Sequence, residues 1–212
     1  MSKERPILFN GAMVRAILSG AKTQTRRLCK DMNAWVDQGC REVRDVDGVP
    51  HHFLLGAQTP IEKLRCPFGQ PGERLWVREN WARVPSTAYR CSTGVEQAED
   101  PEHPGMAAVY AAGWERSNPG RWRPSIHMPR WACRLVLEIT DVRVERLQAI
   151  SEADAITEGL TQMEIGGWLP GPCDHPEWAF HQLWNQVYGE SAWDSNPWVW
   201  VIHFKRVEVS GV

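Results

Sequence analysis

The segment 20–27, GAKTQTRR, places one amine, two hydroxyls and two guanidinium groups within eight residues. Such a set could support nucleophilic chemistry. A threonine hydroxyl attacks once a base takes its proton, and a lysine can be that base when neutral or can stabilise an oxyanion when charged. The alternative is structural: basic residues after the end of a helix interact favourably with its dipole, by about 0.3–1 kcal/mol, and Gly20 is expected to end a helix.

Strand alternation limits which of these groups can meet. In a strand that begins at Lys22, Lys22 and Arg26 share one face, whereas Thr25 and Arg27 share the other. A bulge or a turn at the start of the strand would therefore be needed to bring Lys22 and Thr25 together.

Glu158 is the second residue that could do chemistry. The segment 151–159 predicts a helix with Ser151 as its N-cap and Gly159 as its end. Glu158 then puts a negative charge at the helix C-terminus, which the helix dipole disfavours. A local rule broken without a local gain often marks a functional position. The alternative is a surface glutamate that costs a few tenths of a kcal/mol.

The rest of the sequence predicts an α+β fold: a small mixed β-barrel with short helices packed outside it. Strands are expected at 5–10, 22–28, 74–80, 132–147 and 197–209, and helices at 11–20, 151–159 and 176–189. The strand at 132–147 could break near Asp141. Two segments, 29–63 and 83–129, show no sustained period and are expected to be insertions. The whole chain, 1–212, is expected to form a single domain.

Composition excludes several classes of protein. No run of residues is long and apolar enough to span a membrane, and the six cysteines are interpreted as free thiols of a cytoplasmic protein. The net charge of −2 argues against coating of duplex DNA by bulk electrostatics, although acid-free basic stretches at 15–27 and 116–134 leave room for a small basic site. The twelve tryptophans favour a large core, and some could stack on bases.

Four blocks of the chain together resemble the ASCH domain family, whose barrel is related to the PUA fold of RNA-binding and RNA-modifying proteins. The blocks cover somewhat over half of the chain, in family order. They read ILSGAKTQTRR, PGERLWVRE, LQAISEADAITEGL and NPWVWVIHFKRV. The longer motifs CPFGQPGERLWVRE and WRPSIHMPRWACR are similar to versions that phages and prophages commonly carry.

One branch of this family removes the acetyl group from N(4)-acetylcytidine. Matched residue by residue, its catalytic lysine, threonine and glutamate fall on Lys22, Thr25 and Glu158, and a further motif arginine falls on Arg27. The present chain is about twice as long as members of that branch. It also reads QTRR where they have apolar spacers, so Arg26 is a further candidate for binding substrate.

The resemblance leaves two catalytic schemes open. In the first, neutral Lys22 takes the proton of Thr25, which requires lowering the lysine pKa by roughly three units, about 4 kcal/mol. In the second, charged Lys22 stabilises the oxyanion and Glu158 acts as the base for Thr25 or water. The charge of Glu158 favours the second scheme at this stage.

Two further stretches hold candidates for substrate binding. The block 122–134 combines Ser125, Arg130 and Trp131 and could hold a base and a phosphate, or could be a rigid surface loop. Arg78 and Glu79 lie on opposite faces of an expected strand, so one of them points inward. An ion pair is as reasonable for these two as a ligand contact.

No cofactor or metal is expected. Cys173 and His175 stand at near-ligand spacing without a second pair, and no phosphate-binding glycine loop is present. We therefore expect a metal-independent hydrolase of a modified nucleoside or a related small amide. The alternatives are a non-catalytic module that binds RNA or single-stranded nucleic acid, and a ribonuclease. The expected partners are thus a nucleoside or RNA.

Overall fold

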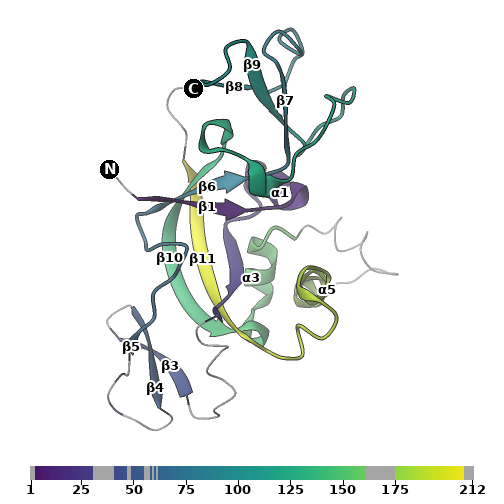
Figure 1. Ribbon diagram of the computed structural model, residues 1–212. Helices are drawn as coiled ribbons and strands as arrows, with labels where there is room; N and C mark the ends of the chain where they lie inside the picture. Colours follow the sequence, from purple (N-terminus) through teal and green to yellow (C-terminus); the bar gives the residue numbers. More distant parts are fainter. Residues whose placement is uncertain are drawn as a thin grey trace. The chain divides into compact units, whose positions relative to one another are not determined.

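The computed structural model describes residues 3–30, 41–46, 49–54, 58, 60, 62–160 and 175–207. The chain divides into two compact units. Figure 1 labels helices and strands of both. The first unit comprises Met1–Gly20, Gly72–Ile139 and Lys205–Val212. The second comprises Ala21–Pro71 and Thr140–Phe204.

The first unit contains a sheet segment with the strand order β1-β6-β10. Its strands are β1 (Glu4–Leu8), β6 (Arg74–Arg78) and the first residues of β10 (Val136–Arg146). β1 runs parallel to β6, and β10 runs antiparallel to it, with Val136 opposite Trp76. Helix α1 (Gly11–Leu18) follows β1 and begins at Asn10, whose side chain accepts a hydrogen bond from the Met13 amide at 2.9 Å. This capping satisfies one of the free amides of the first turn.

A second sheet of the first unit lies within the segment that showed no sustained period. It has the order β7-β9-β8, formed by β7 (Trp81–Pro85), β9 (Met106–Tyr110) and β8 (Ala98–Glu99). Two short 3-10 helices follow, Ser125–His127 and Arg130–Ala132. Four of the five β9 side chains are buried, so the strand has no alternation of polar and apolar residues for sequence reasoning to detect.

The second unit continues β10 and adds β11 (Trp198–Val207) and β2 (Gln24–Leu28), in the order β10-β11-β2. β10 is one unbroken strand through Asp141, where a break was considered. A 3-10 turn (Leu147–Ala149) precedes α3 (Glu152–Thr157), which packs against α5 (Pro176–Tyr188). The core between these elements is apolar: Leu147, Ile150, Ala155, Phe180, Trp184, Val199 and Val201.

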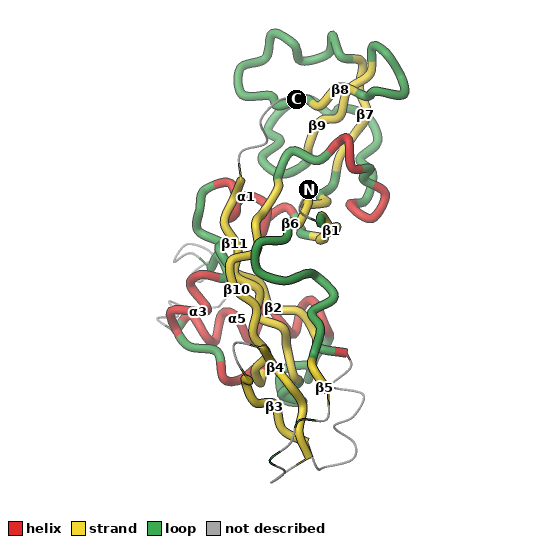
Figure 2. Tube along the Cα trace, turned by 90° about the vertical axis from the view of Figure 1, so that its left-hand side faces the viewer, coloured by secondary structure: helices red, strands yellow, loops and turns green. Residues whose placement is uncertain are grey.

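A separate antiparallel sheet of the second unit lies in the other expected insertion. Its order is β3-β4-β5, and its strands are β3 (Arg41–Val46), β4 (Val49–Leu54) and β5 (Glu62–Lys63). Figure 2 shows β3 and β4 as neighbouring extended strands of the trace. The two segments without a sustained period therefore each carry a small sheet of their own.

The expected α+β class is confirmed, because sheets dominate the described chain and its helices are few. The expected closed barrel is not observed. β1 and β2 are edge strands, and each pairs with a neighbouring strand on one side only within the described residues. A barrel closes only when its two edge strands pair. No helix among the described residues is both long and apolar enough to cross a membrane.

Candidate functional site

Lys22 and Glu158 meet in the second unit. The backbone just before β2 forms an isolated bridge with the end of α3 that pairs these two residues. Lys22 Nζ lies 2.8 Å from Glu158 Oε2 and 2.8 Å from the Glu158 carbonyl oxygen. The two residues are buried, with 2% and 6% of their surface exposed. The lysine thus satisfies a carbonyl at the helix C-terminus and balances the acid that the helix dipole disfavours there.

Arg26 holds the same carboxylate from the other side. Its Nη1 lies 3.1 Å from Glu158 Oε1, and its Nη2 lies 3.0 Å from Asp154 Oδ2 and 2.6 Å from Glu145 Oε1. The Arg26 side chain has no exposed surface. Arg26 was expected to bind substrate, but its guanidinium instead contacts three carboxylates of the protein.

Arg143 extends this arrangement along β10. It lies 3.1 Å from Asp154 Oδ2 and 3.1 Å from Glu145 Oε2, and it also contacts the ring of His203. Burial and the charge of Arg143 lower the pKa of His203. We call the whole set the charge network: Lys22, Arg26, Arg143, Glu145, Asp154, Glu158 and His203.

Sequence reasoning missed four members of the network: Arg143, Glu145, Asp154 as an ion-pair partner, and His203. A signal existed in the expected strand at 132–147, because residues 143 and 145 share a face of any strand. That signal does not say which element the face meets. Only the packing of α3 beside β2 supplies the arginine and the aspartate that complete the network.

Thr25 lies on the opposite face of β2 from the network. β2 pairs with β11 in continuous register, with Thr25 opposite Ile202, and Thr25 is buried. On the other face Gln24 donates a hydrogen bond to the Asp154 carbonyl at 2.6 Å, beside Arg26. The structure therefore brings Lys22 and Glu158 together and leaves Thr25 across the strand, as alternation requires.

The environment of Lys22 makes its amine easier to deprotonate than that of a free lysine. Burial lowers the pKa of Lys22 and is the largest cause, the Glu158 carboxylate opposes this, and the charges of Arg27 and Arg26 lower the pKa further. Because Arg26 also contacts Glu158, the carboxylate does not need the lysine charge to be balanced. A buried amine of lowered pKa beside a carboxylate is suited to accept and return a proton.

The other expected site residues belong to the first unit. Glu79 is buried and forms two hydrogen bonds with Arg134, at 2.8 Å from Nε and 2.9 Å from Nη2. Burial raises the pKa of Glu79, while Arg134 opposes the rise. Arg134 also lies 3.0 Å from Glu96 and stacks on the ring of Tyr110. The sequence left an ion pair and a ligand contact open for this residue, and in the structure Glu79 forms an ion pair with Arg134.

Arg78 and Arg130 both stack on Trp76. Their guanidinium carbons lie 5.3 Å and 6.0 Å from the ring centre. Arg78 also donates a hydrogen bond to the Ile126 carbonyl. Arg130 pairs with Glu4 at 2.9 Å. These contacts attach the block 122–134 to β1 and β6.

Ser125 and Trp131 have structural contacts as well. The Ser125 amide donates to Asn80 Oδ1 at 3.0 Å, which starts a 3-10 turn. Trp131 meets Trp81 edge to face, with ring centres 5.8 Å apart. These contacts anchor the block within the first unit.

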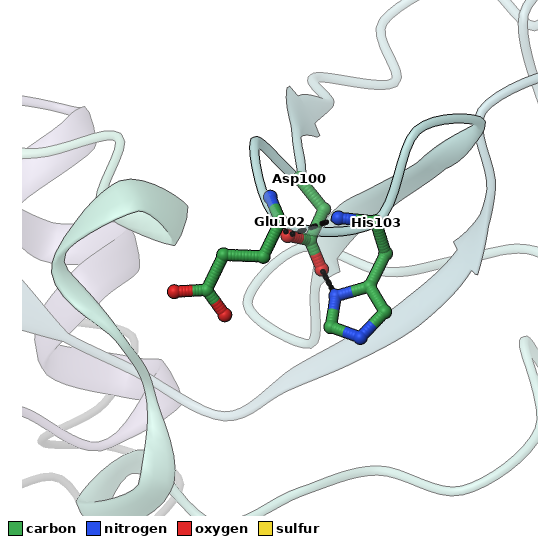
Figure 3. A group of neighbouring side chains, drawn as sticks. All are labelled: Asp100, Glu102 and His103. Carbon is green, nitrogen blue, oxygen red and sulfur yellow. Dashed lines mark hydrogen bonds and ion pairs between the residues drawn. The ribbon is translucent and has the colours of Figure 1, made fainter.

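One cluster has the composition of a metal site. Asp100, Glu102 and His103 lie on the turn after β8, with one ligand atom of each within 4.8 Å of the others (Figure 3). The Asp100 carboxylate accepts hydrogen bonds from the amides of Glu102 and His103, at 2.9 Å and 3.2 Å. Arg83 Nη2 lies 2.8 Å from Asp100 Oδ2, and His103 Nδ1 lies 3.3 Å from the same oxygen. The cluster is accounted for as a turn. Cys173 lies outside the described residues.

A scan against family models and a search of curated proteins give no match. Two solved structures are similar. One is an Enterococcus faecalis V583 protein assigned to the family model DUF984, with 10% identity, a TM-score of 0.39 and coverage of 100% of this chain and 86% of that chain. The other is an ASCH domain from Lactobacillus crispatus JV V101, with 14% identity, a TM-score of 0.37 and coverage of 96% and 79%.

Proposed function

We propose that this protein is a metal-independent hydrolase of a modified nucleoside or a related small amide, with N(4)-acetylcytidine as the first substrate to test. The observation that carries the proposal is the buried contact of 2.8 Å between Lys22 Nζ and Glu158 Oε2. A structural ion pair is the competing explanation, and the charge network includes several such pairs. What favours catalysis is the lowered pKa of the Lys22 amine.

Lys22 acts as the base in this proposal. A neutral amine has two N–H donors, so Lys22 can keep both of its hydrogen bonds to Glu158 after it loses its proton. Glu158 then orients the amine, and Arg26 holds the Glu158 carboxylate in place. The burial of Lys22 and the two arginines near it thus favour the first of the two schemes, in which the lysine is neutral.

The reaction balances with this pair alone. The nucleophile gives its proton to Lys22 Nζ while its oxygen attacks the acyl carbon, which forms a C–O bond and an oxyanion. The C–N bond then breaks, and the leaving amine takes the proton from the Lys22 ammonium. With water as the nucleophile the products are the carboxylic acid and the free amine.

The nucleophile is the part of the proposal that the position of Thr25 affects most. Across the strand from Lys22, the Thr25 hydroxyl is poorly placed to give its proton to that amine. We therefore propose water as the nucleophile and assign Thr25 to packing beside Ile202. Thr25→Val keeps the shape of the side chain and removes the hydroxyl, so it separates the two possibilities.

The test follows the release of cytidine from N(4)-acetylcytidine by chromatography. We expect turnover by the unaltered protein, loss of at least a hundredfold in Lys22→Met, since general bases contribute about 10²–10⁴-fold, and retained turnover in Thr25→Val. Lys63→Met, which alters an exposed lysine of the same unit, is the matched control. Full turnover by folded Lys22→Met would rule out the lysine as base, and loss of turnover in Thr25→Val would restore the covalent scheme.

A further inference from the structure

We propose that the first unit carries a binding site for a nucleotide-sized phosphate ester, distinct from the charge network. A pocket of about 370 Å³ is lined by Arg83, Arg121, Arg123, Pro124 and His127, which we call the arginine pocket. It lies outside the four blocks that resemble the ASCH domain, in the segment 83–129. Every lining residue except the proline is a cation or can become one.

The sequence RWR at 121–123 explains why two arginines line one pocket. The side chains of neighbouring residues in extended backbone point to opposite sides. Arg123 is bridged to Trp81, with backbone hydrogen bonds of 2.7 Å and 3.2 Å. Trp122 packs into the apolar cluster of Val84 and Trp114, so Arg121 and Arg123 are directed the other way, toward the pocket.

Indole rings hold two of the guanidinium groups in place. Arg123 lies over the Trp81 ring, 5.1 Å from its centre, and Arg83 lies over the Trp131 ring at 5.8 Å. Arg83 Nη2 is paired with Asp100 at 2.8 Å, whereas its buried Nε has no hydrogen-bond partner within the described residues. Stacked guanidinium groups lose less side-chain freedom when they bind a phosphate.

The arginine pocket has an excess of positive charge. Asp100 balances Arg83, but no ion pair in the described part of the chain involves Arg121, Arg123 or His127. This contrasts with the overall charge of −2. Uncompensated arginines that converge on one cavity are suited to a phosphate, which accepts two parallel hydrogen bonds from one guanidinium.

The size of the pocket narrows the ligand. Its volume of about 370 Å³ lies at the lower end of the range of about 300–1,000 Å³ found for small-molecule sites. It therefore has room for more than an inorganic phosphate ion. A nucleoside monophosphate, free or as a unit of single-stranded RNA, supplies the phosphate and fits this space.

The experiment is isothermal titration calorimetry of the full chain with AMP, adenosine, inorganic phosphate and a single-stranded oligouridylate. An adenine nucleotide is used so that cytidine binding near Lys22 does not interfere. We expect AMP to bind more tightly than phosphate, and adenosine not to bind. Arg121→Ala should weaken AMP binding by about tenfold or more, because a hydrogen bond to a charged group is lost. Arg90→Ala, at an exposed arginine of the same unit, should leave it unchanged.

The outcomes separate the sources of the phosphate. Displacement of AMP by the oligouridylate, with an affinity that falls steeply with salt, identifies a nucleic-acid strand as the ligand. AMP binding that the oligouridylate does not displace identifies a free nucleotide. Equal binding of AMP and adenosine, no binding of AMP, or AMP binding unchanged in both Arg121→Ala and Arg123→Ala would overturn the proposal. The result does not depend on whether the protein hydrolyses N(4)-acetylcytidine.

Discussion

The arginines of the charge network and those of the arginine pocket differ in burial and in the number of their ion pairs. Arg26 is fully buried and contacts three carboxylates, whereas Arg121 is exposed and contributes to no described ion pair. A buried guanidinium without partners would be too costly, so each charge of the network is balanced by the protein itself. An exposed guanidinium is hydrated and can exchange its water for a ligand. Burial thus separates arginines that hold the fold from arginines that can bind.

Arg26→Met breaks this comparison most strongly. This substitution removes the guanidinium group that contacts Glu145, Asp154 and Glu158. Lys22 still contacts Glu158, and Arg143 still contacts Glu145 and Asp154. We expect the free energy of unfolding to fall by about 3–5 kcal/mol, as for other buried pairs that lose one partner.

Urea denaturation followed by circular dichroism measures this loss. Arg65→Met, at an exposed arginine of the same unit, serves as the control and should change the free energy of unfolding by less than about 0.5 kcal/mol. A similar small change in Arg26→Met would show that the network contributes little to stability.

The pH dependence of turnover sharpens the role of Lys22. If neutral Lys22 is the base, kcat/KM for N(4)-acetylcytidine should rise about tenfold per pH unit until the pH passes the lowered pKa of Lys22. If the enzyme instead needs charged Lys22, kcat/KM should stay level below that pKa and fall about tenfold per pH unit above it. Measurement of kcat/KM at several pH values, with the fold monitored at each, decides between the schemes.

The free energy of unfolding should also depend on the titration of Lys22, and it should rise with pH. The pKa of Lys22 in the folded chain lies below the value of 10.5 for a free lysine. Between these two values the unfolded chain binds a proton that the folded chain does not, so the free energy of unfolding rises with pH there. Lys22→Met should lack this rise. Urea denaturation of the unaltered protein and of Lys22→Met at several pH values measures the difference.

Arg121→Ala gives the smallest expected effect on stability and completes the comparison. Because Arg121 is exposed and has no described ion pair, its removal should change the free energy of unfolding by no more than about 0.5 kcal/mol. AMP at a hundred times its dissociation constant should raise the stability of the unaltered protein by about 2.7 kcal/mol, and that of Arg121→Ala by less. Thermal unfolding with and without AMP measures both. A large loss without ligand would make Arg121 structural.

Local signals in the sequence predicted the helix at the site well. Ser151 accepts a hydrogen bond from the Asp154 amide at 3.2 Å, and Gly159 follows the helix with φ 93°, as capping chemistry requires. The opposite faces of Lys22 and Thr25 also followed from strand alternation alone. These features depend on neighbours in the chain, so the sequence contains them in full.

Features that depend on packing could not be predicted in this way. The partners of Arg26 come from β10 and from α3, and no periodicity states that these elements meet beside β2. β9 was missed because its side chains are buried on both faces. The expected barrel required pairing of β1 and β2, which no local pattern determines.

The turn around Asp100 links hydrogen exchange at two backbone amides to the occupancy of the arginine pocket. The Asp100 carboxylate accepts hydrogen bonds from the backbone amides of Glu102 and His103. It also forms an ion pair with Arg83, which lines the pocket. A bound phosphate that competes for Arg83 changes the electrostatic environment of Asp100. The strength of the two hydrogen bonds from the Glu102 and His103 amides to Asp100 then changes as well. Deuterium uptake at these amides would then report whether the pocket is filled, without any label on the ligand.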